Sequence, residues 1–177
     1  MMVNNEIGAV EPIAEAAKIV KEKNPNTIIH VDAIQAYGKL PIVPKNMGID
    51  LLSTSGHKIH GPKGIGFLYI KEGTKISPII FGGGQQKGMR SGTENVPGIV
   101  GLAVACEKMI GKNYENAEKI REVKEYFQER IKEIEDIKDN SGKAPHVASI
   151  SFKKLRSEVL LHALEDREIY VSSGSAC

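Results

Sequence analysis

The chain has 177 residues, and its 24 basic and 22 acidic residues leave a formal net charge of only +2. This balance gives no reason to expect direct binding of nucleic acid or of an anionic membrane, and no apolar run approaches the ~20 residues of a membrane-spanning helix. A hydrophobic content of 41% is ordinary for a globular protein, and this length allows one or two domains.

The first half of the sequence predicts a helix followed by short strands. Glu11 and Pro12 are typical of a helix start, because a proline in the first turn gives up no helical hydrogen bond. Apolar runs that predict buried strands follow at residues 27–31, 50–55 and 64–70. A polar, glycine-rich loop then runs from Gly82 to Thr93.

The second half predicts two helices, then a strand, a helix and a strand. Residues 96–110 form an apolar run that predicts a buried helix. Residues 116–138 repeat apolar side chains every three or four positions, which predicts an amphipathic helix. Ser157 is the predicted N-cap of a helix over 158–166. The last two strands are predicted at 147–152 and 169–171.

This alternation of strands and helices favours an α/β architecture. The amphipathic helix is long enough to lead from a larger layer to a smaller one. We therefore predict a large domain over residues 1–112 and a partial small domain over residues 113–177.

Asp32 and Lys58 stand where a pyridoxal phosphate (PLP) site would need them. Each follows an apolar strand, and α/β folds bind ligands at the carboxyl ends of their strands. A lysine forms a Schiff base with the PLP aldehyde, and an aspartate keeps the ring nitrogen protonated so that the ring acts as an electron sink. Taken alone, Asp32 would be an ordinary loop or capping residue and Lys58 a solvated lysine.

Neighbouring polar residues suit the rest of the cofactor. Gln35 lies one turn after Asp32 and could reach the phenolic oxygen of PLP. Ser55 and His57 precede Lys58 and offer donors to a phosphate. The glycines at 82–84 and the run 90–93 are typical of an anion-binding loop, although a flexible surface loop has the same composition.

The two cysteines differ in their surroundings and are too far apart to suggest a disulfide framework. Cys106 lies in the apolar helix and is interpreted as an inert core thiol. Cys177 follows small residues that cannot bury it, which favours a nucleophile on a mobile loop over a mere chain end. With no visible signal peptide, a reducing, cytoplasmic setting is expected. His146 and His162 form no metal-ligand spacing with the cysteines, so no metal site is predicted.

Together these runs resemble the cysteine desulfurases of the NifS/IscS type, which are PLP enzymes of the aspartate aminotransferase fold (fold type I). The resemblance implies part of the large mixed-sheet domain and the start of the smaller α+β domain. The sequence runs that carry it are Met1 to Gly8, His30 to Gln35, Ser55 to Gly64, Gly82 to Gly84, Arg90 to Thr93, and Ser172 to Cys177.

The resemblance implies a role for each matching residue. Lys58 would bind PLP covalently and shuttle protons, and Asp32 would pair with the pyridine nitrogen. The other cofactor contacts would be Asn5 and Gln35 near the ring oxygen, Ser55 and His57 at the phosphate, and Thr93 at the phosphate of a neighbouring subunit in a homodimer. Cys177 would take sulfur from L-cysteine, giving L-alanine and a persulfide for an iron–sulfur scaffold protein or a tRNA-thiolation carrier.

The family protein is about twice as long as this chain, so further site residues are expected outside it. The isolated chain is therefore expected to be weakly active or inactive. Two other interpretations stay open. One is a selenocysteine lyase or aminotransferase of the same fold, for which Cys177 would not be required. The other is a fragment or complementing half that gains function only with a second polypeptide.

Overall fold

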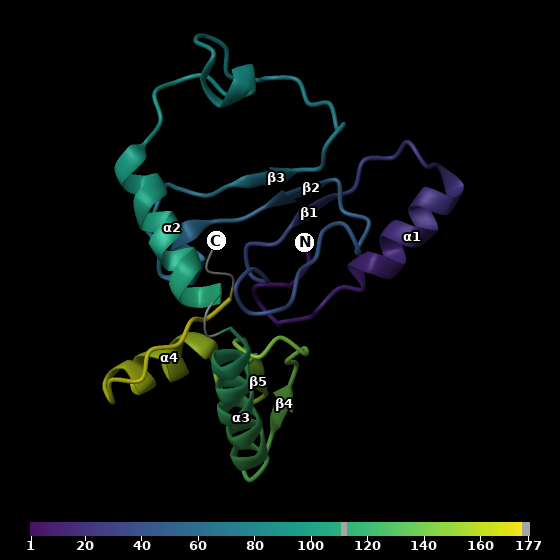
Figure 1. Cartoon of the computed structure of the whole chain (residues 1–177). Coiled ribbons are helices and arrows are strands. Elements are labelled where there is room, and N and C mark those ends of the chain that lie inside the picture. The colour runs from purple at the N-terminus through teal and green to yellow at the C-terminus, as the bar shows by residue number, and fades with distance from the viewer. Residues whose placement is uncertain (111–112, 175–177) are drawn as a thin grey trace. The chain divides into compact units, whose positions relative to one another are not determined.

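A computed structural model describes residues 1–110 and 113–174 of the chain (Figure 1), and its contacts form two compact units. The first unit comprises Met1–Met2 and Pro12–Asn113. The second comprises Val3–Glu11 and Tyr114–Cys177. The predicted division at residue 112 stays a prediction for the complete protein. In this structure the segment Val3–Glu11 groups with the second unit rather than with the sequence that follows it.

A mixed three-stranded sheet forms the centre of the first unit. It contains β1 (His30–Asp32), β2 (Leu51–Ser53) and β3 (Leu68–Ile70), in that order. β1 and β2 are parallel, whereas β2 and β3 are antiparallel. The regular strands are shorter than the apolar runs that predict them. Beyond the ladder the chain still pairs at single points, for example where the Gly56 N–H donates to the Ile65 carbonyl at 2.8 Å.

Two helices flank this sheet (Figure 1): α1 (Ile13–Lys23) and α2 (Val96–Ile110). Both begin where the sequence predicts. The prediction that the 96–110 helix is buried was wrong, because Val96, Val100 and Val104 are exposed while Leu102 and Ala105 are buried. A helix that packs against a single layer can bury only one of its faces. The other apolar face of α2 is therefore exposed to solvent in this structure.

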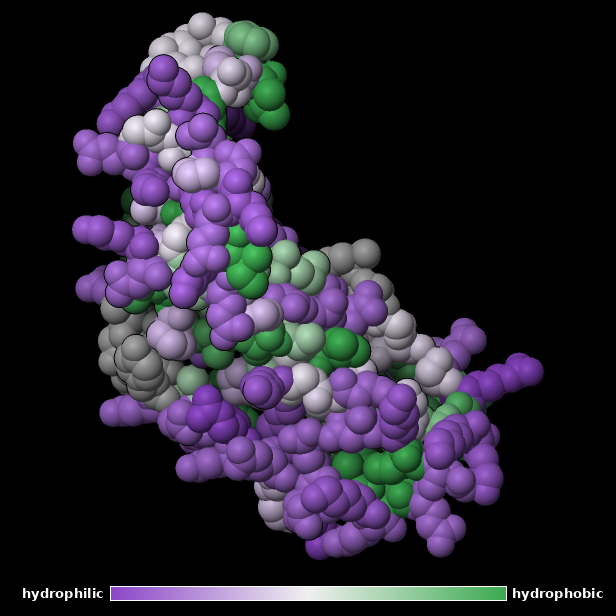
Figure 2. Space-filling model, turned by 90° about the vertical axis from the view of Figure 1, so that its right-hand side faces the viewer, coloured by the Kyte–Doolittle hydropathy of each residue, from purple (hydrophilic) through white to green (hydrophobic). Residues whose placement is uncertain are grey.

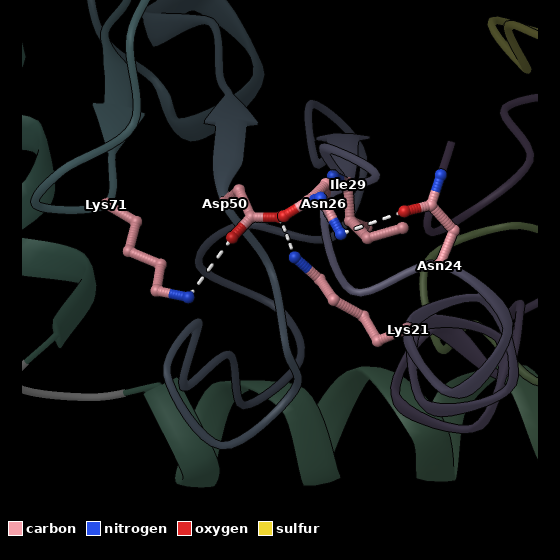
Figure 3. A network of polar contacts seen from close by, with 6 residues as sticks. All are labelled: Lys21, Asn24, Asn26, Ile29, Asp50 and Lys71. Atoms are coloured by element: carbon pink, nitrogen blue, oxygen red, sulfur yellow. Dashed lines mark hydrogen bonds and ion pairs between the residues drawn. The ribbon is translucent and has the colours of Figure 1, made fainter.

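A buried carboxylate ties the sheet to α1 (Figure 3). Asp50 precedes β2 and is only 3% exposed. Its carboxylate accepts hydrogen bonds from the Lys21 ammonium and from the Ile29 N–H at 2.9 Å, and it pairs with Lys71 at 3.2 Å. Burial by itself raises the pKa of Asp50, but these hydrogen bonds outweigh it and lower the pKa to about 2. The carboxylate therefore stays charged in the folded chain.

The second unit contains α3 (Asn113–Ile131), β4 (Ile137–Asp139), β5 (Ile150–Phe152) and α4 (Ser157–Glu165). β4 and β5 pair antiparallel, with Ile137 opposite Phe152. The prediction of a helix continuing to residue 138 was wrong. The helix ends at Ile131, and Asp136, left-handed at φ 59°, then turns the chain directly before β4.

Two further predictions for this unit need correction. Residue 156, not Ser157, is the N-cap of α4, and the Ser157 hydroxyl accepts a bond from Ser173 at 2.7 Å. The expected strand at 169–171 does not form. Instead Glu168 is left-handed at φ 60° and the Ile169 N–H returns to the Leu164 carbonyl at 3.0 Å. These bonds close the end of α4 and leave the next residues exposed.

Hydrophobic side chains reach the surface at several places on the face shown in Figure 2. Among the residues whose exposure the structure describes, the most exposed large apolar side chains are Ile79 and Phe81 at 89% and 80%. They lie in the segment between β3 and α2, which arches away from the sheet (Figure 1). In the part of the chain that the structure describes, no helix combines the length and apolar character of a membrane span.

We expect Asp50→Asn to lower the free energy of unfolding of the chain at pH 7 by about 1–3 kcal/mol, because it weakens buried charge-assisted hydrogen bonds. The folded pKa of about 2 lies below the ordinary value of 3.8, so this stabilisation is present above pH 4 and is lost as the pH falls toward 2. Urea denaturation at several pH values measures both effects.

The matched control for this experiment is Glu72→Gln, which removes an exposed carboxylate next to Lys71. This control should unfold like the wild type at pH 7. The difference between wild type and Asp50→Asn should shrink between pH 4 and 2. A difference that stays constant over that range would show that the Asp50 charge does not stabilise the fold.

Candidate active site

The parallel pairing of β1 and β2 places the predicted site residues at one edge of the sheet. Asp32, the last residue of β1, lies opposite Ser53, the last residue of β2. The Ala33 N–H donates to the Ser53 carbonyl at 2.9 Å, so the two strands leave the sheet side by side. The segments that carry Gln35 and Lys58 therefore leave the sheet at the same edge.

Asp32 is held in place by one of its oxygens. It is half-buried, and Oδ1 accepts a hydrogen bond from the Ile34 N–H at 2.9 Å. This short-range bond fixes the carboxylate in a turn just beyond β1. Among residues 1–110 and 113–174, Oδ2 has no hydrogen-bond partner. It is therefore available to a donor from outside the chain.

Lys58 lies in a 3₁₀ turn, η1 (Gly56–Ile59), that follows β2. Its N–H donates to the Ser55 carbonyl at 3.3 Å, and the Gly61 N–H returns to the Gly56 carbonyl at 2.9 Å. His60 closes the turn in a left-handed conformation at φ 64°. The half-buried Lys58 side chain has an ammonium, Nζ, without a hydrogen-bond partner in the part of the chain that the structure describes. The turn is thus fixed while the amine stays available.

Ser55 and His57 form a polar pair beside Lys58. Ser55 Oγ lies 2.7 Å from His57 Nδ1, and the imidazole is exposed. This contact orients the ring relative to the hydroxyl. The pair can present donors to an anion at the start of η1, as the sequence predicts.

The turn that carries Lys58 packs against α2. Ile59, Leu102 and Ala105 form a buried apolar cluster. A Cβ added to Gly56 would lie 3.2 Å from Leu102 Cδ1, so the glycine allows α2 to approach closely. The position of η1 therefore depends on the packing of one helix face.

Cys106 and Tyr37 border this cluster. The Tyr37 hydroxyl donates to Cys106 Sγ at 3.6 Å, and the Tyr37 ring meets the Phe67 ring edge to face at 5.2 Å between centroids. Burial, followed by the contact with Cys106, raises the pKa of Tyr37 to about 12. Cys106 packs against the core as predicted, although it is half-buried rather than fully enclosed.

Sequence reasoning missed Lys39 as a part of this site. The half-buried Lys39 Nζ donates to the Lys58 carbonyl oxygen at 3.0 Å. Burial lowers the pKa of Lys39, and the nearby charge of Lys58 lowers it further. The only local signal is its place after Gly38, because nothing in the sequence reveals a contact across 19 residues.

The glycine-rich loop is closed on itself. Ser91 is buried and its hydroxyl donates to the Gly83 carbonyl at 2.8 Å, while the Gly92 N–H donates to the Gln85 side chain at 3.2 Å. A second 3₁₀ turn, η2 (Gln85–Gly88), forms the tip. Thr93 is exposed just after this closure. The loop therefore presents Thr93 outward.

Two predicted residues belong to other parts of the chain. Asn5 is half-buried and belongs to the second unit, within the segment Val3–Glu11. Cys177 lies outside the described residues. Among the described residues, no group of three or more His, Cys, Asp or Glu side chains could hold a metal ion.

A surface hollow in the described part of the chain does not coincide with this site. It measures about 580 Å³ and is lined by residues of α1 and of the loop before β2, including Lys18, Lys21 and Lys45. Lys21 and Lys71, which also line it, already neutralise Asp50. None of the residues predicted to bind the cofactor lines this hollow.

Comparisons with known proteins point to one family. The family model described as aminotransferase class-V matches residues 1–177. A putative cysteine desulfurase, IscS 1 of Bacillus subtilis, is 45% identical over all of this chain and 47% of its own length. A solved NifS-like protein matches 98% of the chain and 48% of its own length at 39% identity, with a TM-score of 0.93. A NifS-like protein from Rickettsia africae matches 98% of the chain and 49% of its own length at 35% identity, with a TM-score of 0.91.

The packing of α2 against η1 gives a direct test. We expect Leu102→Ala to lower the free energy of unfolding by about 2–4 kcal/mol, because it leaves a cavity beside Gly56 and Ile59. Val104→Ala, on the exposed face of the same helix, should change it by no more than about 0.5 kcal/mol. Urea denaturation measures both variants. Equal losses in the two variants would mean that α2 does not support the turn through this face.

Proposed function

The chain belongs to the class-V aminotransferase family, and on that premise we propose that the complete protein is a PLP-dependent cysteine desulfurase. The chain spans about half the length of the curated relatives it matches. The predicted family resemblance and fold class, PLP-dependent fold type I, are confirmed. One observation supports the proposed activity. Asp32 Oδ2 and Lys58 Nζ both lack hydrogen-bond partners among the described residues, and both residues lie at or just beyond the same edge of the sheet.

These residues fit PLP, the cofactor of this family. Lys58 supplies the amine that holds its aldehyde carbon, and Asp32 supplies a carboxylate for the ring N–H. Ser55 and His57 offer donors for the phosphate, and Gln35 stands one turn beyond Asp32 for the ring oxygen. When bound, the cofactor withdraws electrons from the substrate carbon and so makes its proton easier to remove.

The chain's own groups would then handle protons and sulfur. The Lys58 amine would carry a proton from the substrate carbon. Cys177 would take the sulfur: the C–S bond of L-cysteine breaks, an S–S bond to Cys177 forms, and the carbon gains a proton to give L-alanine. This exchange needs no added oxidant, since a thiol and cysteine become a persulfide and alanine.

The partners follow from the same scheme. A persulfide must be passed on, so we propose an iron–sulfur scaffold protein or a tRNA-thiolation carrier as its acceptor. Thr93 is exposed at the end of a self-closed loop, which suits a contact with the phosphate in a second subunit of a homodimer. The proposed setting is the cytoplasm, because a reducing compartment keeps Cys177 available as a thiol.

A second candidate role is that of a complementing half. The sheet of the first unit has only three short strands, and the open face of α2 carries the exposed residues Val96, Ile99 and Val100. Exposed apolar groups of this kind are typical of surfaces that another polypeptide covers. In this role the chain would bind PLP productively only with a second polypeptide.

The first prediction from this proposal concerns the lysine. When the purified chain is mixed with PLP and reduced with borohydride, the pyridoxyl label should be found on Lys58 by peptide mass spectrometry. Lys58→Ala should lose this label, whereas Lys63→Ala, which removes an exposed lysine five residues on, should keep it. Labelling scattered over surface lysines in the wild type would instead support the complementing-half role.

A second prediction separates desulfurases from other PLP enzymes of the fold. In protein that turns over L-cysteine, Cys177→Ser should abolish formation of the protein-bound persulfide while labelling of Lys58 stays at the wild-type level. Cys106→Ser should leave persulfide formation intact, because that thiol packs in the core. Persulfide measured at wild-type levels in Cys177→Ser would contradict the proposed sulfur transfer.

A further inference from the structure

The turn after β1 is built to approach η1 closely. Its backbone folds back in successive turns, with the Tyr37 N–H donating to the Ala33 carbonyl at 2.8 Å and the Lys39 N–H to the Ala36 carbonyl at 3.0 Å. Gly38 has a φ of 76°, and a Cβ there would lie 3.1 Å from Ile59 Cγ2 and 3.0 Å from Met109 Cε. The left-handed conformation therefore requires glycine at 38, and a larger residue would also crowd Ile59. The next residue is Lys39.

Lys39 reaches the backbone of Lys58 from this position. Its ammonium donates at 3.0 Å to the Lys58 carbonyl oxygen, near the end of a 3₁₀ turn whose final carbonyls have no partner within the turn. A charged donor makes this a stronger bond than a neutral one would be. The bond joins the segment that follows Asp32 to the residue proposed to hold the cofactor.

Holding the Lys39 ammonium in this position costs free energy, which an uncharged donor to the same carbonyl would not cost. Burial disfavours its charged form, and the neighbouring Lys58 adds repulsion. The second unit contains a useful comparison in Lys124, whose ammonium donates to the Gly142 and Ala144 carbonyls at 2.6 and 2.8 Å. There burial also lowers the lysine pKa, but the charge beside it is Asp139, which favours the cation. Lys39 is instead held next to a second lysine.

We propose that Lys39 is a positioning residue for Lys58. It fixes the backbone of η1 relative to the turn after Asp32, so that the Lys58 amine and the Asp32 carboxylate keep a constant separation. This proposal rests on the proposed function, since the position matters only if Lys58 holds the cofactor. It also makes Gly38 part of the site, because Gly38 brings Lys39 to η1.

Amide hydrogen exchange of residues 56–61, followed by mass spectrometry, tests the positioning without any cofactor. In Lys39→Met, which keeps the apolar stem and removes the charge, exchange in this segment should be about tenfold faster than in the wild type, as expected for loss of one charge-assisted hydrogen bond. Lys39→Arg should restore most of the protection. Lys124→Met, the matched loss of a lysine–carbonyl contact, should leave residues 56–61 unchanged.

The borohydride labelling of Lys58 supplies the functional measurement. Lys39→Met should label about tenfold more slowly at Lys58, Lys39→Arg should recover, and Lys124→Met should match the wild type. Unchanged exchange in Lys39→Met would overturn the positioning role. Faster exchange with labelling at the wild-type rate would overturn its importance for the site. If even the wild type shows no label, the proposed function fails for this chain, while exchange still decides the positioning.

Discussion

The first unit depends on one buried carboxylate. Asp50 accepts hydrogen bonds from α1 through Lys21 and from the chain entering β1 through Ile29, and it pairs with Lys71 just after β3. A buried charge without partners would be strongly unfavourable. The folded chain must therefore bring all three donors to the Asp50 carboxylate. This requirement holds β1 and β2 in the register that puts Asp32 opposite Ser53. A slip by one residue would turn Asp32 to the other face of the sheet.

The opposite end of the same strands is fixed by apolar packing instead of charge. Ile59 lies beneath α2, and glycines at positions 38 and 56 let the surrounding chain close on it. The backbone of Lys58 is therefore fixed while its amine has no protein partner in the described part of the chain. Asp32 repeats this arrangement, with one oxygen hydrogen-bonded and the other without a partner among the described residues. A rigid backbone with available functional groups is what a preorganised cofactor site requires.

The sequence could predict those parts of the site that depend on short, local sequence patterns. An apolar run followed by Asp32 or by Ser55 to Lys58 indicates a strand end with polar groups, and parallel pairing then unites them. The buried contacts of Asp50 and Lys39 were not predicted, because their partners lie 19 to 29 residues away in the sequence. A charged residue beside an apolar run is normally predicted to be exposed. The strand expected at 169–171 and the overlong helix fail for a related reason. Each helix ends in a turn that contains one left-handed residue, Asp136 or Glu168, and apolar periodicity does not predict such turns.

The apolar face of α2 affects the stability of this protein, whereas other contacts set the geometry of the site. Full burial of an apolar side chain of this size contributes about 1.5–3 kcal/mol, and Val96 and Val100, which are 61% and 56% exposed, make only part of that contribution in this chain. The chain spans about half the length of these relatives, and any segment that covers α2 would add the rest of this contribution. The described contacts that shape η1 and the Asp32 turn, in contrast, come from residues 31–109 and from the Met2 N–H, which donates to the Asp32 carbonyl at 2.8 Å. The local geometry around Lys58 is therefore set by this chain's own packing, whereas the stability of that packing would be increased by the segments that cover α2.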